Sequence, residues 1–247
     1  MRICVSGTCS QGKSSYIDGF LKNWTEYSTP KKTYRSWLKG NHSKKTTKDV
    51  QWRILNDMVD EMQKHSTGDK VIYDRGPLDN IALTIWAGSK GIKDIDADFI
   101  NKCISIVRES FKFLDIIFMV PITNAAEPVK YDTDDFKADK KKGLVDEQFR
   151  QEVDFLLKGL KYDWEHNSQS KFFDHEDKPA IIEVFGTLEQ RLQITKLYLD
   201  DKGELIGGDF AADMFTEDDI RQTEMLKEQF GISDTQSEVY KNKGKIT

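Results

Sequence analysis

The segment after the first apolar run carries residues that can hold phosphate. The string Gly7-Thr8-Cys9-Ser10-Gln11-Gly12-Lys13-Ser14 has glycines, a lysine and a hydroxyl at the spacing of a phosphate-binding loop. In such a loop, backbone N–H groups and the start of the following helix point at the phosphates, and the lysine bridges the β- and γ-phosphates. The pattern predicts a nucleoside triphosphate site, with ATP as the expected nucleotide. Its expected binding residues are Gly7, Gln11, Gly12, Lys13, Ser14 and Ser15.

A carboxylate and an arginine follow another apolar run. Lys70–Asp74 ends in an acid at the point where phosphate-loop proteins place the carboxylate that holds magnesium. We therefore expect Ser14 and Asp74 to bind Mg²⁺. Arg75 comes next, where its fork can bind the acceptor or the migrating phosphoryl group, so we expect a catalytic and substrate-binding role for it. Asp79, in the first turn of the next helical pattern, is accounted for by the helix dipole alone.

The segments that position these residues alternate between short apolar runs and helical patterns. This order is typical of an α/β domain in which helices cover a mostly parallel sheet, here of five strands. We expect the strands at Arg2–Val5, Lys32–Leu38, Lys70–Asp74, Asp115–Pro121 and Pro179–Phe185. We expect the helices at Lys13–Trp24, Thr46–Lys64, Pro77–Trp86, Ala97–Phe113, Asp146–Leu160 and Thr187–Leu199.

Two polar regions interrupt this alternation. Residues 123–143 are charged and too long for an ordinary connection in a compact domain, which predicts a mobile lid spanning about 123–165 together with the helix that follows. Residues 200–247 contain one further helical pattern, Thr216–Phe230, flanked by polar and Gly-rich sequence. We therefore expect one domain over 1–199 and a C-terminal extension over 200–247.

A family resemblance rests on three of these segments. The run Val71–Asp79 (VIYDRGPLD), the phosphate loop and Ile181–Gly186 (IIEVFG) together resemble the thymidylate-kinase-like and deoxynucleoside-kinase-like P-loop kinases. The similarity is greatest to the small phage-type kinases of the AAA class, and it covers about 1–199. The resemblance implies a three-layer P-loop kinase fold with a lid. It also implies that Gly186 lies beside the adenine ring of ATP.

Acceptor residues are suggested by position and by this resemblance. Gln51 falls at the centre of the apolar face of Thr46–Lys64, where a buried amide needs a partner. The resemblance implies that Gln51 reads the edge of a nucleobase, and the alternative is a core glutamine that hydrogen-bonds within the protein. Arg35 could also face the acceptor.

Arg150 is the expected lid arginine. It lies at the edge of the apolar stripe of Asp146–Leu160, and the surrounding sequence resembles the lid helix of the phage kinases. An arginine on a mobile element stabilises the transition state of phosphoryl transfer. The commoner Gly-x-Arg element of the family lid is missing here, because Phe136-Lys137 stands in its place. This departure leaves the identity of the acceptor open.

The charge and composition of the chain argue against a general nucleic-acid-binding protein and against a membrane protein. The 42 acidic and 37 basic residues give a net charge of −5, unlike the basic footprint of a general nucleic-acid binder. No run of eighteen apolar residues is present and Met1-Arg2 leads directly into a strand, so we expect no membrane contact and a cytoplasmic location, the host cytoplasm if the chain is phage-encoded. Three cysteines without metal-ligand spacing predict neither a disulfide nor zinc. Homodimer formation stays open.

Three functions fit these residues. The first is ATP- and Mg²⁺-dependent phosphoryl transfer to a nucleoside or a (deoxy)nucleoside monophosphate. The second has a polynucleotide as acceptor, at a 5′ end or at a hydroxymethylated pyrimidine. It is favoured by the basic residues Lys31, Lys32, Arg35, Lys39, Lys44, Lys45 and Lys48. The third is an NTP-dependent regulatory ATPase.

Overall fold

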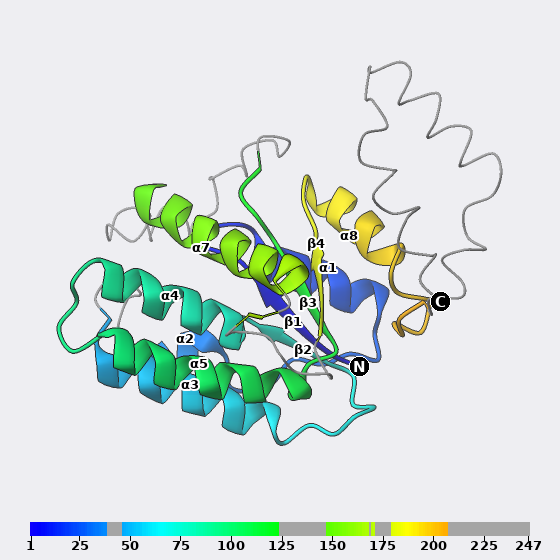
Figure 1. Cartoon of the computed structure of the whole chain (residues 1–247). Helices are drawn as coiled ribbons and strands as arrows, with labels where there is room; N and C mark the ends of the chain where they lie inside the picture. The colour runs from blue at the N-terminus through cyan, green and yellow to red at the C-terminus, as the bar shows by residue number, and fades with distance from the viewer. Residues whose placement is uncertain (39–45, 124–146, 168, 171–178, 207–247) are drawn as a thin grey trace, which may run out of the picture. The chain divides into compact units, whose positions relative to one another are not determined.

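The computed structural model describes the backbone of residues 1–38, 46–123, 147–167, 169–170 and 179–206 (Figure 1). The chain divides into two compact units, Met1–Glu204 and Leu205–Thr247. Most of the predicted lid loop and the predicted helix Thr216–Phe230 lie outside the described residues.

Four parallel strands form the sheet that the described residues make. They are β1 (Arg2–Ser6), β2 (Val71–Asp74), β3 (Ile116–Met119) and β4 (Ala180–Glu183), in the order β2-β1-β3-β4. After β1 the chain adds β2 on one side of it and then β3 on the other side. The carboxyl end of β1 is therefore the point where the strand order reverses, which is where open α/β sheets bind ligands.

The prediction of five strands is wrong, because Lys32–Leu38 does not form a strand. Its residues Tyr34–Leu38 form the short helix α2 instead. The side chains of Tyr34 and Trp37 are both buried and stand three residues apart, which is a helical spacing rather than the period of two that a strand needs. The Ser36 hydroxyl donates to the Thr33 carbonyl over 2.7 Å and stabilises this turn.

The sheet edge beyond β2 carries a single bridge in place of the missing strand. Ser28 pairs with Val71 in parallel, and its carbonyl accepts a hydrogen bond from the Ile72 N–H over 3.0 Å. The other four predicted strands are confirmed, each within a few residues of its expected bounds.

The helices also match their expected positions, with ends shifted by a few residues, except that α7 continues past the expected Leu160 to His166. They are α1 (Lys13–Asn23), α3 (Lys48–Met62), α4 (Pro77–Ser89), α5 (Ala97–Ser110) with the 3₁₀ turn η2 (Phe111–Phe113), α7 (Glu147–His166) and α8 (Leu188–Lys196).

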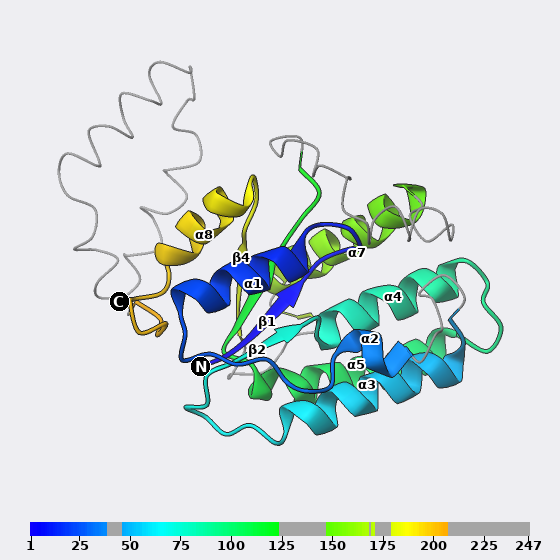
Figure 2. The same cartoon turned by 180° about the vertical axis from the view of Figure 1, so that it is seen from behind.

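Two apolar clusters cover the two faces of the sheet. Cys4, Tyr73 and Ile117 point from the strands into one cluster, with side chains of α3, α4, α5 and α7. Their strand neighbours point the opposite way into the second cluster, which α1 fills and the partly buried residues of α8 extend. Figures 1 and 2 show these helix layers from opposite sides of the sheet. Alternation along the strands therefore produces a three-layer α/β domain, as expected.

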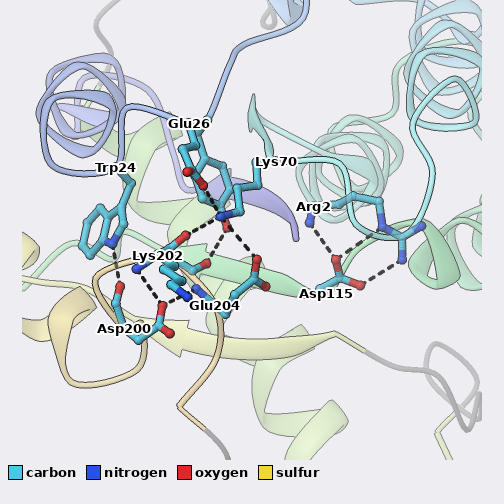
Figure 3. Close-up of polar contacts among 10 residues, drawn as sticks. Arg2, Trp24, Glu26, Lys70, Asp115, Asp200, Lys202 and Glu204 are labelled. Carbon is cyan, nitrogen blue, oxygen red and sulfur yellow. Dashed lines mark hydrogen bonds and ion pairs between the residues drawn. The ribbon is translucent and has the colours of Figure 1, made fainter.

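The amino ends of the strands are closed by polar contacts (Figure 3). Arg2, which begins β1, pairs with Asp115 just before β3 over 2.9 Å. The turn after α8 docks nearby, since the Trp24 indole donates to the Asp200 carbonyl over 2.8 Å and Lys70 donates to the Lys202 carbonyl over 2.6 Å. The ends of the strands that could bind a ligand are therefore the opposite, carboxyl ends.

Cys4, Cys9 and Cys103 are free thiols. Within the ranges that the structure describes, no helix is both long and apolar enough to span a bilayer.

Candidate phosphate and acceptor site

The phosphate loop leaves the carboxyl end of β1 and enters α1. Gly7 has φ +145°, and a Cβ at that position would lie 2.6 Å from the Val120 carbonyl oxygen, so only glycine fits. Gly12 is the N-cap of α1 with φ +71°, and no side chain caps the helix there. The first N–H groups of α1 therefore lack a side-chain cap and can bind an anion. Gln11 is buried in the loop, whereas Ser14 and Ser15 are exposed on the first turn of α1.

Lys13 is folded into the loop that precedes it. The residue is 6% exposed, and Nζ donates to the carbonyls of Gly7 over 2.8 Å and Thr8 over 2.6 Å. Burial, and next the positive charge of Arg75, lower the pKa of Lys13 to about 8. The hydrogen bonds therefore keep the Lys13 ammonium group at the phosphate loop, although burial and Arg75 destabilise its charged form.

Arg75 reaches the same loop from the end of β2. Its backbone N–H donates to the Val5 carbonyl, and its φ of +73° is a conformation that non-glycine residues seldom adopt. Nη1 donates over 3.0 Å both to the Gly7 carbonyl and to Oδ1 of Asp79. The guanidinium also lies 4.9 Å from the centre of the Tyr34 ring, a cation–π distance. Arg75 is therefore fixed beside the loop by contacts from several elements.

Asp79 is a structural member of this site that the sequence reasoning missed. Its side chain is fully buried, and Oδ1 accepts hydrogen bonds from the Gly7 N–H over 3.1 Å and from Arg75. Oδ2 accepts from the Gly76 N–H over 3.1 Å. The helix dipole alone does not account for these contacts. The signal in the sequence was the position of Asp79 three residues after Gly76, the N-cap of α4, from which a carboxylate can reach back to the N-cap N–H.

Ser14 and Asp74 line one cavity at this end of the sheet. The cavity has a volume of about 170 Å³, and Ile17, Trp37 and Arg75 also line it. The Asp74 carboxylate is half-buried and makes no hydrogen bond or ion pair with any residue that the structure describes. Magnesium in phosphotransfer sites takes one or two protein oxygens and completes its shell with water and phosphate. A hydroxyl and an unpaired carboxylate facing one cavity fit that requirement.

The Gln51 amide makes three hydrogen bonds within the protein. Nε2 donates to the Thr46 hydroxyl over 2.7 Å, and Oε1 accepts from Asn80 over 2.9 Å and from Thr84 over 3.3 Å. These bonds fit a core glutamine, the alternative to base reading, and they use one of the two N–H groups of the amide. Oδ1 of Asn80 in the same group is buried and has no hydrogen-bond partner among the described residues.

Arg150 approaches the phosphate loop from α7. Its side chain is buried, Nε donates to the Cys9 carbonyl over 3.1 Å, and Nη1 pairs with Glu147 over 2.7 Å. The expected lid arginine thus contacts the loop directly. Arg35 belongs to α2, but its side chain lies outside the described part of the chain. Gly186 follows β4 with φ +83°, and its carbonyl accepts from Arg191 of α8.

Comparisons with known proteins identify the fold. No protein-family model and no curated protein matches this chain. Two solved structures of the deoxyadenosine kinase from M. mycoides are similar to it. The one with dCMP and dCDP bound has a TM-score of 0.51 and 15% identity over 80% of this chain and 96% of the other. The one with dATP bound has a TM-score of 0.45 and 18% identity over 80% of this chain and 98% of the other. The first similarity shows that this chain shares the α/β fold of that enzyme, a parallel sheet flanked by helices.

Proposed function

We propose that this chain is an ATP-dependent kinase that transfers the γ-phosphoryl group to a nucleoside or a (deoxy)nucleoside monophosphate. One observation carries the proposal: Lys13 and Arg75 converge on the carbonyl of Gly7, next to the cavity that Ser14 and Asp74 line. Catalysis of phosphoryl transfer consists mainly of positioning and of stabilising negative charge. Two cations fixed at one point of a phosphate loop can position the phosphates and stabilise their negative charge.

The donor side is assigned to the loop and to α1. The backbone N–H groups of the loop and of the first turn of α1 bind the phosphates, and Lys13 contributes its charge. Mg²⁺, held by Ser14 and Asp74, would neutralise charge on the phosphate oxygens. Arg150 adds a third cation through its contact with Cys9, where it can stabilise the transferring group.

The acceptor side is assigned to the cavity, whose apolar wall and Arg75 suit a nucleoside with or without a phosphate. A monophosphate acceptor needs no general base, whereas a hydroxyl acceptor needs a carboxylate within hydrogen-bond reach. Asp18 lines the same cavity one helical turn after Ser14, and unlike Asp74 it has no assigned magnesium role. We assign the base to Asp18 if the acceptor is a nucleoside.

A polynucleotide acceptor remains the second candidate because one of the clustered lysines, Lys32, lines the cavity. Residues 39–45 of that cluster lie outside the described residues. A polyanionic acceptor makes binding strongly salt-dependent, since each neutralised phosphate releases counterions. Acceptor KM values measured between 50 and 200 mM salt therefore separate the two candidates: a rise of about 10³-fold or more indicates a polynucleotide.

The deciding experiment is a coupled ADP-release screen of the full chain with ATP and Mg²⁺ over nucleosides, nucleoside monophosphates and oligonucleotides. Lys13→Ala should abolish release, while Lys22→Ala, farther along α1, serves as the matched control and should retain it. Circular dichroism checks that both variants fold. Acceptor-dependent release that persists in Lys13→Ala contradicts the proposal. Release that no acceptor stimulates supports the regulatory ATPase instead.

A further inference from the structure

Arg191 is a buried cation that connects two parts of the donor side. Its side chain extends from α8, and the residue is 4% exposed. Nε donates to the Gly186 carbonyl over 3.0 Å, and Nη1 donates to the Gln11 carbonyl over 2.6 Å. Nη1 also lies 3.3 Å from the point where a Cβ on Gly12 would be. One guanidinium therefore joins the turn after β4 to the phosphate loop.

The start of α8 holds Arg191 in this position. The Thr187 hydroxyl accepts from the Gln190 N–H, and the Gln190 side chain accepts from the Thr187 N–H over 2.8 Å, a reciprocal helix cap. One turn after Arg191, the Thr195 hydroxyl bonds with the hydroxyl of Tyr16 on α1 at 2.6 Å. The arginine is thus anchored both at the start of its own helix and through α1.

The charge of Arg191 is not paired with a carboxylate of any residue that the structure describes. Its hydrogen-bond partners are carbonyl oxygens, and across the described ranges it forms no ion pair. Arg2 is similarly buried but pairs with Asp115. A buried charge without a counter-charge is costly, and burial lowers the pKa of Arg191 from its usual range. A bound anion at the adjacent loop would offset that cost.

We propose that Arg191 is a positioning residue of the donor site, which fixes the turn at Gly186 against the phosphate loop and adds positive charge behind the phosphates. The inference rests on the proposed function, since it takes the ligand of the loop to be a nucleoside triphosphate. It assigns to α8 a share of donor binding and none of acceptor binding. Arg191 belongs to the opposite sheet face from α3, and the residues that line the acceptor cavity do not include it.

Substitution of Arg191 should weaken the binding of ATP and leave the binding of the acceptor unchanged. Arg191→Gln loses both the charge and the fork, so the Kd of ATP should rise at least about tenfold, the effect of losing one charged hydrogen-bonding group. The Kd of AMP, which carries less charge, should rise less. Arg191→Lys keeps the charge but cannot span both carbonyls, so it should restore part of the affinity. The acceptor KM should stay within about twofold, because losing Arg191 removes no contact with the acceptor.

Isothermal titration of ATP, ADP and AMP into the full-length variants tests the inference, with thermal unfolding measured in parallel. Arg2→Gln is the matched control: it removes another buried arginine and should lower Tm while leaving the Kd of ATP unchanged. A wild-type Kd in Arg191→Gln overturns the inference, as does an equal rise of Kd in Arg2→Gln. If Arg191→Gln does not fold, Arg191→Lys carries the test, and a wild-type Kd in that variant has the same meaning.

This design distinguishes the inference from the proposed function. Donor binding is measured without an acceptor, so a wild-type chain that binds ATP but phosphorylates nothing contradicts the proposed function alone. A chain that phosphorylates its acceptor normally and keeps its ATP affinity after Arg191→Gln contradicts the Arg191 inference alone.

Discussion

Lys13 and Arg75 donate hydrogen bonds to the same atom, the carbonyl oxygen of Gly7, over 2.8 and 3.0 Å. The two side chains come from α1 and from the end of β2, and Arg75 also lines the cavity shared by Ser14 and Asp74. Burial together with the proximity of Arg75 lowers the pKa of Lys13 to about 8. Part of the positive charge at this point is therefore titratable just above neutral pH.

Donor binding should weaken as pH rises through about 8, the pKa of Lys13. The protonated lysine attracts phosphate, and above its pKa the charged population falls about tenfold per pH unit, so the Kd of ATP should rise by up to that factor. Arginine stays charged throughout this range, so Lys13→Arg should give a flat profile. Titrations of ATP between pH 7 and 9.5 check this, and a wild-type profile as flat as that of Lys13→Arg contradicts it.

Loss of the Asp79 charge should disable the site and destabilise the fold together. Asp79→Asn leaves the buried Arg75 without its counter-charge, and breaking a buried pair costs about 3–5 kcal/mol. Urea unfolding measures the loss, and the ADP-release assay should show a parallel loss of activity. Glu109→Gln removes an exposed pair with Lys112 and should cost no more than about 1 kcal/mol. An equal loss of unfolding free energy in the two variants would show that the Asp79–Arg75 pair contributes no more than an exposed ion pair.

Features of this fold that depend on neighbouring residues in the sequence could be predicted, whereas contacts between residues far apart in the sequence could not. The turn from β1 into α1 and four strands were predictable because their signals are local: glycine spacing and short apolar runs. The strand predicted at 32–38 was wrong because Tyr34 and Trp37 are buried at a helical spacing within a stretch that reads equally well as extended.

The contacts that complete the site join residues far apart in the sequence. Gly7 and Asp79 are 72 positions apart, and Gln11 and Arg191 are 180 apart. No local pattern reports such a pairing. The spacing of Thr187 and Gln190 was a visible capping signal, however, and it places Arg191 in the first turn of a helix that follows the carboxyl end of a strand.

Substitution of Gln51 should affect the acceptor more than ATP. We propose that the second N–H of its amide, beyond the one donated to Thr46, meets the acceptor base. Gln51→Leu leaves its partners Asn80 and Thr84 unsatisfied, which should cost about 1–3 kcal/mol of stability. The factor by which the acceptor KM rises should be at least ten times the factor for the KM of ATP, which corresponds to roughly 1.4 kcal/mol of lost binding. Steady-state kinetics with each substrate varied decides the point, and equal rises for both substrates would exclude base reading by Gln51.

Removal of the Arg150 side chain should slow transfer rather than donor binding. Its contact with Cys9 places the charge at the phosphate loop, and a positioned arginine contributes about 10³–10⁵-fold to phosphoryl transfer. Arg150→Ala should therefore lower kcat by about 10³-fold and change the Kd of ATP far less. Lys161→Ala removes another cation from α7 that pairs with Glu165 and should leave kcat unchanged. A loss in Arg150→Ala confined to the Kd of ATP would assign Arg150 to ground-state binding.

The turn after α8 should contribute to stability and not to the site. Gly203 has φ +75°, and a Cβ there would lie 2.6 Å from the Tyr27 ring, whose hydroxyl donates to the Gly203 carbonyl. Gly91 has a similar φ of +68° but has no atom within 4 Å of such a Cβ. Gly91→Ala therefore reports the cost of the backbone conformation alone, about 1–2 kcal/mol.

Gly203→Ala adds a steric clash to that conformational cost, which should destabilise the fold by about 1–3 kcal/mol more. Urea unfolding of both variants measures the difference. The turn lies with Trp24, Lys70 and the amino ends of the strands (Figure 3), so the Kd of ATP should be unchanged in Gly203→Ala. Equal stability of the two alanine variants would mean that the turn does not pack on Tyr27, and weaker ATP binding in Gly203→Ala alone would mean that the two ends of the sheet are coupled.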